Sequence, residues 1–190
     1  MAGKIVYLGW GSLIWNPGNL PIDPSLWQQS NLKLPLEFSR ISDKGRGRMT
    51  LVIDDINGKN NNIWINYCLE PNVNKAINYL KLREQTSKNN IAYINLRTRK
   101  YRIPNTSLHI IKKLVQWATK SGVEVIIWTD LKSNWKQIRG MEYNIRDAFD
   151  YYESAQHETQ IDIMDYVKKA TTIAQINTKF SGQFSKYSKL

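Results

Sequence analysis

The sequence contains little cysteine, little histidine and no long apolar run. Cys68 is the only cysteine, so no internal disulfide can form. With only His109 and His157 beside it, a metal site is not expected, and Cys68 is interpreted as a small buried hydrophobe in a strand. No stretch approaches the roughly 20 apolar residues that cross a bilayer. The run Ile5–Leu8 is too short for the core of a signal peptide, so we expect a cytoplasmic protein without a membrane segment.

Acidic residues are scarce relative to basic ones. The chain has 27 Lys and Arg against 16 Asp and Glu, a formal net charge of +11. Such an excess can attract nucleic acid, anionic lipid or acidic substrates. The basic residues are densest in Arg97–Arg102 and recur between Lys179 and Lys189. Because no recognised nucleic-acid motif accompanies them, we interpret them as a solvated basic surface and do not expect nucleic acid as a partner.

Length and the order of elements predict the fold class. A chain of 190 residues is one ordinary domain. Strand patterns come first, and helices and strands then alternate. The predicted strands are residues 4–8, 36–41, 48–53, 63–69, 91–96 and 123–128, and the predicted helices are residues 72–84, 106–121, 142–153 and 158–170. Consecutive early strands argue against a doubly wound parallel sheet, so we expect an α+β protein with a mixed curved sheet or small barrel flanked by helices.

Turn signals predict how some of these segments connect. Residues 43–45, Asp-Lys-Gly, are a predicted turn. Residues 55–58, Asp-Ile-Asn-Gly, carry a hairpin signal, so the strands on either side of them are expected to pair. The polar segment 171–190 is predicted to be a C-terminal tail that is extended or frayed.

The segment after the first predicted strand is the least ordinary part of the sequence. Residues 9–13 read Gly-Trp-Gly-Ser-Leu. Glycines permit backbone geometries that expose successive N–H groups to an anion or a carbonyl oxygen. Ser12 adds a hydroxyl, and Trp10 and Trp15 add apolar walls. The segment is therefore a candidate site for a carboxylate or an oxyanion, although a tight turn whose tryptophans fill the core would show the same pattern.

A carboxylate stands at the end of the first predicted helix. Glu84 is four residues after Leu80 and continues the apolar stripe on which Ile77 lies. A carboxylate on a core-facing stripe is unusual, and burial there would raise its pKa and suit it to proton transfer near neutral pH. A surface ion pair, or a frayed helix end facing water, is the alternative interpretation.

The loop and the carboxylate together resemble a known family. The stretch Gly11-Ser12-Leu13 with Trp15-Asn16-Pro17 is similar to the Tyr-Gly-Ser-Leu and Trp-x-Pro motifs of the γ-glutamylcyclotransferase superfamily, which includes the ChaC-type enzymes. Residues 44–51 resemble the family's Gly-Arg stretch entering a strand, and residues 76–84 resemble its helix ending in Arg-Glu. The resemblance covers roughly residues 4–100. Trp10 stands where the family usually has tyrosine, and residues 85–90 lack the glycines common in ChaC-type proteins.

The resemblance implies an enzyme that converts a γ-glutamyl amide or peptide into 5-oxoproline and a released amine or amino acid. It implies Glu84 as the catalytic acid/base, and the backbone N–H groups of Gly11, Ser12 and Leu13 as donors to the oxyanion and the substrate carboxylate. Trp10 would narrow the pocket. Arg48 is expected to bind a carboxylate and Tyr93 to line the pocket. The expected partner is a small γ-glutamyl substrate, and the reaction needs no metal and no cofactor.

Several alternatives remain open at this point. The same fold could act on other γ-glutamyl compounds, such as γ-glutamylamines. A second alternative is a non-catalytic member that binds a small acidic ligand. A third, less favoured by the sequence, is a basic nucleic-acid-binding protein.

Overall fold

The computed structural model describes residues 4–42 and 46–187 and is a mixed α+β structure with a seven-stranded mixed sheet and flanking helices. The turn predicted at residues 43–45 lies outside the described residues. The strands, in the spatial order β3-β2-β4-β1-β7-β5-β6, are β1 (Ile5–Gly9), β2 (Gln28–Ile41), β3 (Met49–Ile53), β4 (Lys59–Tyr67), β5 (Ile91–Asn95), β6 (Lys100–Arg102) and β7 (Val125–Thr129). The α+β class and a mixed sheet with flanking helices are thus confirmed.

The chain divides into two compact units, each made from two separate stretches of sequence. Unit 1 takes the described residues within 1–33 and 62–131, and unit 2 takes those within 34–61 and 132–190. Both β2 and β4 run from one unit into the other. The prediction of one domain therefore stays a prediction.

Unit 1 is built on β1, β7 and β5. β1 pairs parallel with β7 and antiparallel with β4, and β5 joins the other edge of β7 in antiparallel register. β1 and the first four residues of β7 are fully buried, as expected for strands covered on both faces. The unit also contains α1 (Ser12–Trp15), α2 (Val73–Arg83), α3 (Leu108–Ser121) and the 3₁₀ turns η1 (Pro24–Leu26) and η2 (Lys88–Asn90).

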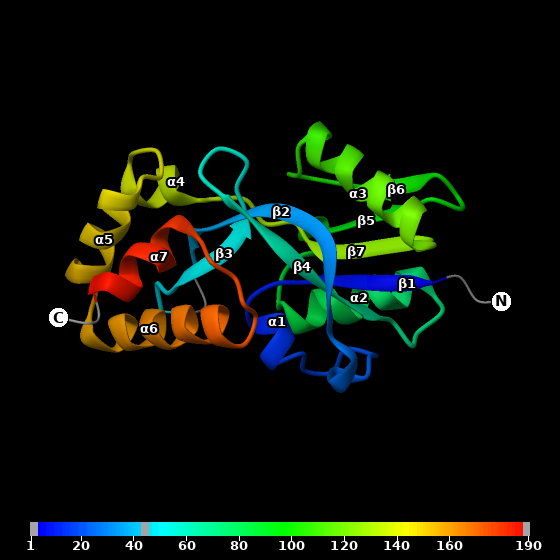
Figure 1. The fold of residues 1–190 in the computed structure, drawn as a ribbon, viewed down its shortest axis with the longest axis horizontal. Helices are drawn as coiled ribbons and strands as arrows, with labels where there is room; N and C mark the ends of the chain where they lie inside the picture. Colours follow the sequence, from blue (N-terminus) through cyan, green and yellow to red (C-terminus); the bar gives the residue numbers. More distant parts are fainter. Residues whose placement is uncertain (1–3, 43–45, 188–190) are drawn as a thin grey trace. The chain divides into compact units, whose positions relative to one another are not determined.

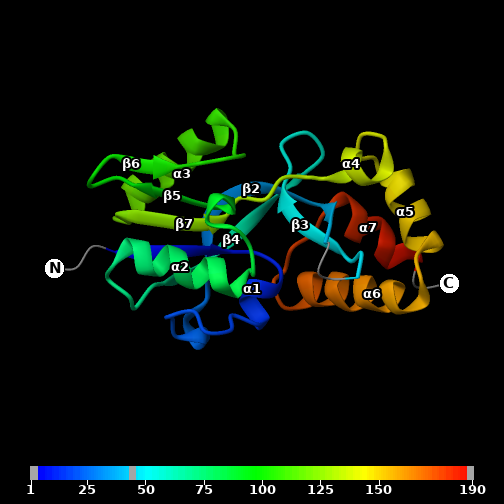
Figure 2. The same ribbon diagram turned by 180° about the vertical axis from the view of Figure 1, so that it is seen from behind.

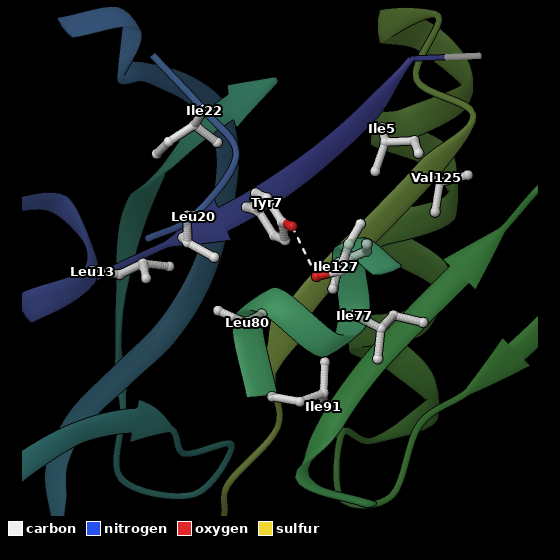
Figure 3. Close-up of a cluster of buried hydrophobic side chains, with 11 residues drawn as sticks. Ile5, Tyr7, Leu13, Leu20, Ile22, Ile77, Leu80, Ile91, Val125 and Ile127 are labelled. Atoms are coloured by element: carbon white, nitrogen blue, oxygen red, sulfur yellow. Dashed lines mark hydrogen bonds between the residues drawn. The ribbon is translucent and has the colours of Figure 1, made fainter. Parts of the chain in front are cut away.

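Helices α2 and α3 lie on opposite sides of these strands (Figures 1 and 2). The side of α2 holds a cluster that joins the loop after β1 to the helix: Ile5, Tyr7, Leu13, Leu20, Ile22, Ala76, Ile77, Leu80, Ile91, Val125 and Ile127 (Figure 3). Tyr7 is fully buried, and its hydroxyl donates to the Ala76 carbonyl at 2.8 Å. The core on this side therefore fixes the position of α2 against β1.

Helix α2 matches its prediction closely. Its buried residues are Ala76, Ile77 and Leu80, and the Asn72 side chain caps it by accepting from the Lys75 N–H. For helix α3 the sequence predicts Thr106 as the N-cap residue and a core-facing stripe of Leu108, Ile111, Leu114, Val115 and Ala118. The helix departs from this prediction, because Ser107 is the N-cap residue and Leu108 is exposed. Its buried residues are Ile110, Leu114, Trp117 and Ala118, which shifts the buried stripe from the predicted one.

The predicted hairpin between β3 and β4 is wrong. The turn itself forms, since the Asp54 carboxylate accepts the backbone N–H groups of Ile56 and Asn57. However, β2 lies between β3 and β4 in the sheet, and β3 pairs with β2. β2 is 14 residues long and far exceeds the predicted strand at residues 36–41, so it occupies the edge that the hairpin would have used.

Unit 2 surrounds the second half of β2 with helices α4 (Trp135–Arg139), α5 (Ile145–Ser154), α6 (His157–Thr172) and α7 (Lys179–Tyr187). Phe38 on β2 is fully buried, and its ring lies 6.0 Å from that of Tyr166 and 5.8 Å from that of Phe180. The predicted helices 142–153 and 158–170 correspond to α5 and α6, whereas the short helix α4 was not predicted.

The expectation of an extended or frayed segment after residue 170 is wrong. Helix α6 continues to Thr172, and residues 179–187 form helix α7. Ala174, Ile176 and Phe180 are fully buried. Phe180 and Phe184 of this segment are buried and contribute to the core of unit 2. Among the described helices, none has the length and apolar character needed to cross a membrane.

Candidate functional site

The loop after β1 is shaped by two glycines with different tasks. A Cβ on Gly9 would lie 2.6 Å from the Trp27 ring, so only glycine allows this close approach. Gly11 precedes α1 with φ 63° and ψ −142°, a backbone conformation that L side chains rarely adopt. Its carbonyl accepts the Ile14 N–H at 3.1 Å. The loop therefore turns sharply into α1 and places Ser12 at the first position of that helix.

The end of α2 is closed by a left-handed residue. Glu84 is the C-cap residue, and Gln85 follows it with φ 48°. The Thr86 N–H bonds to the Lys81 carbonyl at 3.2 Å, as in a Schellman motif. Glycine is the usual residue at such a position. This turn fixes where α2 ends and hence where the Arg83 and Glu84 side chains begin.

Arg83 joins the two predicted parts of the site. Its Nη1 donates to the Glu84 carboxylate, and its Nη2 donates to the Ser12 hydroxyl at 3.2 Å. The same guanidinium donates to the Asn16 carbonyl from Nε at 3.1 Å and from Nη2 at 2.6 Å. The loop after β1 and the end of α2 are thus held together by one side chain.

The sequence left open whether Glu84 is buried on the core-facing stripe or lies at the surface in an ion pair, and the structure shows an ion pair with Arg83. The side chains of Arg83 and Glu84 are 11% and 20% exposed, so the ion pair is largely removed from water. A charge-assisted hydrogen bond of this kind is stronger than a neutral one and restricts the rotamer of the carboxylate. Glu84 therefore faces a cation, and its position is set by that cation.

Leu13 and Tyr93 belong to the same apolar cluster on the α2 side of the strands, Leu13 fully buried and Tyr93 partly buried. The Tyr93 ring also lies under the Arg102 guanidinium, with 5.5 Å to the ring centroid. Trp10, which follows β1 directly in the sequence, is partly buried. Unit 1 therefore contains every predicted site residue except Arg48.

Arg48 lies in unit 2. Its guanidinium lies 4.7 Å from the centroid of the Tyr166 ring, and its Nε is buried without a hydrogen-bond acceptor among the described residues. Its role in binding a substrate carboxylate stays a prediction.

Cys68 is only partly buried, which is less than the sequence interpretation assumed. Its Sγ lies 3.5 Å from the Tyr7 hydroxyl, and burial raises the pKa of the Cys68 thiol. Burial also raises the pKa of Tyr7 far above its ordinary range. Both groups therefore stay protonated at neutral pH and act as packing and hydrogen-bonding groups beside the cluster. Across the described ranges, no group of three or more His, Cys, Asp or Glu side chains has a metal-binding arrangement.

Three residues of this region were missed by the sequence interpretation of the site. Arg83 was noted only as part of the Arg-Glu pair, and Asn16 contributes a backbone carbonyl, which carries no sequence signal. Trp27 packs against the cluster, and its indole N–H is buried without an acceptor in the described part of the chain. A buried donor of this kind calls for an explanation, and a bound ligand oxygen is one.

Comparisons with known proteins add no relative. No protein-family model, no curated protein and no solved structure matches this chain. The function of the site must therefore be argued from its own geometry.

Proposed function

We propose that the chain is a γ-glutamylcyclotransferase-like enzyme, with the fold of that superfamily, that cyclises a γ-glutamyl amide or peptide to 5-oxoproline. One observation carries the proposal: Arg83 connects the Glu84 carboxylate to Ser12 in the loop after β1. The loop after β1 and the end of α2 are about 70 residues apart in sequence and meet within unit 1. The family resemblance assigns both segments to the same reaction.

The reaction requires one proton acceptor and one set of oxyanion donors. Glu84 takes a proton from the α-ammonium group of the substrate, and the freed amine nitrogen attacks the γ-carbonyl carbon of the same molecule. The negative charge that develops on the carbonyl oxygen is met by backbone N–H groups of the loop at Gly11–Leu13. The attacking nitrogen, which is positively charged after the attack, gives its second proton to the leaving nitrogen. The carbon–nitrogen bond to that nitrogen then breaks as Glu84 returns the first proton to it. The products are 5-oxoproline and the released amine as its ammonium ion.

Arg83 acts as a positioning residue in this scheme. Its two donors to the Asn16 carbonyl fix the guanidinium independently of Glu84, so the carboxylate is presented from a defined direction. Ring closure is already intramolecular, and the main task of the protein is to hold the folded substrate conformer against a correctly placed base. The Trp27 indole N–H, which is buried without an acceptor in the described part of the chain, is a further polar group of unit 1 that a ligand oxygen would satisfy.

The Arg83–Glu84 ion pair also favours a second function. In this second function, the Glu84 carboxylate has the sole role of holding the Arg83 guanidinium, which in turn holds the loop. The chain is then a non-catalytic module that binds a small acidic ligand. In that case γ-glutamyl compounds raise the unfolding temperature, because a ligand that binds only the folded state stabilises it, but no product forms.

The deciding experiment is a 5-oxoproline assay over a panel of γ-glutamyl amino acids, γ-glutamylamines and glutathione. We expect turnover of at least one compound and a loss of about 100-fold or more in kcat for Glu84→Gln, the size of effect typical of a general base. Glu124→Gln, which changes another partly buried glutamate of unit 1, is the matched control and retains activity. Unchanged turnover in Glu84→Gln refutes the mechanism. Stabilisation without product across the panel supports the binding module instead.

A further inference from the structure

A long stretch of unit 1 is entirely free of acidic residues. No Asp or Glu occurs between Glu84 and Glu124, while eight Lys or Arg residues fall within that stretch. The stretch forms η2, which carries Lys88, then the β5–β6 hairpin and helix α3, which carry the other seven cations. Helix α3 lies beside β6 in both views (Figures 1 and 2). The charge excess that is diffuse in the composition is therefore concentrated on one part of unit 1.

The solvent side of α3 carries three lysines. Lys112, Gln116 and Lys120 are exposed at intervals of four residues, with Lys113 exposed beside them. The row extends about 12 Å along the helix, enough for separate lysines to contact separate phosphates. At the tip of the hairpin, Arg97, Arg99 and Lys100 are also exposed.

An exposed aromatic ring accompanies these cations. Tyr101 on the edge strand β6 is 71% exposed. It pairs with Ile94, so the two side chains share one face of the sheet, opposite to that of the neighbouring Tyr93. Tyr93 packs on the α2 side, and Tyr101 therefore lies on the α3 side. The ring and the lysine row thus belong to the same side of unit 1.

We propose that this surface, defined by Arg97, Arg99, Tyr101, Lys112, Lys113 and Lys120, binds single-stranded nucleic acid. Lysine and arginine neutralise backbone phosphates, and an exposed tyrosine offers a stacking platform for a base that is not paired in a duplex. The stretch itself carries no carboxylate that would repel phosphate, and the nearby carboxylate of Asp130 is buried and accepts hydrogen bonds from Asn105 and Thr106. The surface is on the side of the strands opposite to α2 and Glu84, so this binding is independent of the proposed enzymatic activity.

A membrane surface fits these features less well. A helix that binds a bilayer interface needs an exposed apolar face, whereas the apolar face of α3 is buried on unit 1 and its outer face carries lysine and glutamine. Vesicle binding is therefore an outcome that the experiment must exclude.

The test is fluorescence anisotropy of the full chain with labelled oligouridine and oligothymidine of about 16 nucleotides, the upper end of a single-domain site. The variant Lys112→Ala/Lys113→Ala/Lys120→Ala is compared with Lys33→Ala/Lys75→Ala/Lys88→Ala, which removes three exposed lysines of unit 1 outside this surface. We expect the first variant to bind at least tenfold more weakly and its slope of log affinity against log salt to fall by about 2, at roughly 0.7 per lost phosphate contact. The control variant changes affinity less than twofold.

Tyr101 tests the preference for single strands. Tyr101→Ala should weaken binding to the single strand about fivefold or more with little change in the salt slope, and Tyr101→Phe should retain it, because stacking needs the ring and not the hydroxyl. Circular dichroism and thermal unfolding check that each variant is folded.

Four results would overturn the proposal: no binding at low ionic strength, equal losses in both lysine variants, unchanged binding in Tyr101→Ala, or binding to anionic vesicles of phosphatidylcholine and phosphatidylserine without binding to either oligonucleotide.

Discussion

The carboxylate of Glu37 fastens helix α7 to β2, and its removal should loosen unit 2. Glu37 is fully buried on β2, and its carboxylate accepts backbone N–H groups from Phe38 at 2.9 Å, Lys179 at 3.0 Å and Phe180 at 3.4 Å. The last two donors lie in the first turn of α7, where backbone N–H groups have no partner inside the helix. One side chain therefore caps a helix about 140 residues away in the sequence.

The substitution Glu37→Ala leaves these buried donors without an acceptor. Each buried unsatisfied group costs about 1–3 kcal/mol, and the variant recovers part of this because it no longer buries a carboxylate. We therefore expect the free energy of unfolding to fall by about 2–4 kcal/mol. Urea denaturation followed by circular dichroism measures this change, and hydrogen exchange should show faster exchange of the α7 amides.

The matched control is Glu158→Ala. Glu158 pairs with Arg46 at 2.8 Å, but both side chains are more than two-thirds exposed, and exposed pairs contribute little. Its loss should change stability by less than about 0.5 kcal/mol. If Glu37→Ala is no more destabilised than this control, the capping argument is refuted.

The pH dependence of the difference between wild type and Glu37→Ala has a defined sign. Burial raises the pKa of Glu37 above its ordinary value of 4.5, so the folded chain holds the proton more tightly than the unfolded chain. The stability that Glu37 contributes is therefore fully present below pH 4.5 and declines as the pH rises through the folded-state pKa. The difference in unfolding free energy should shrink over that window, and a difference that grows would contradict this assignment.

Three further substitutions test the roles of glycine and of a residue with positive φ. Gly9→Ala should lower the free energy of unfolding by about 1–3 kcal/mol, because its Cβ would meet the Trp27 ring at 2.6 Å. The control is Gly182→Ala in α7, where an added Cβ would have no atom within 4 Å, and it should raise the free energy of unfolding by up to about 1 kcal/mol. An equal fall in the free energy of unfolding for both variants would contradict the steric explanation. Gln85→Gly should raise the unfolding temperature by about 2–4 °C, since it removes the cost of a non-glycine residue at φ 48°, and an unchanged value in thermal denaturation would argue against strain there.

Local signals predicted much of the fold, and long-range pairing was where prediction failed. Asn72 and the apolar spacing through Leu80 predict α2 because capping and helical periodicity depend only on neighbouring residues. The pairing of β3 depends on β2, whose first residues, 28–33, are polar except for the buried Leu32 and carry no strong strand signal. Phe180 of α7 packs against Phe38, which lies far away in sequence, so its burial could not be inferred locally.

The candidate site shows the same division. The sequence selected the loop at Gly11 and the carboxylate at Glu84 because unusual residue types stand at those positions. It did not indicate that Arg83 would connect them, since two of its contacts end on the carbonyl of Asn16 and a peptide carbonyl is present at every position of the chain.

That contact with a carbonyl has a consequence for how the site can be redesigned. Arg83 grips the loop mainly through a peptide oxygen, which survives replacement of the Asn16 side chain. The end of α2 can therefore stay in place while the side chains at positions 10 and 12 are exchanged, with the buried Leu13 kept as part of the core. A library randomised at these two positions would vary what the loop presents to a ligand while the two bonds to the Asn16 carbonyl remain, which makes the loop a suitable place to select new specificities.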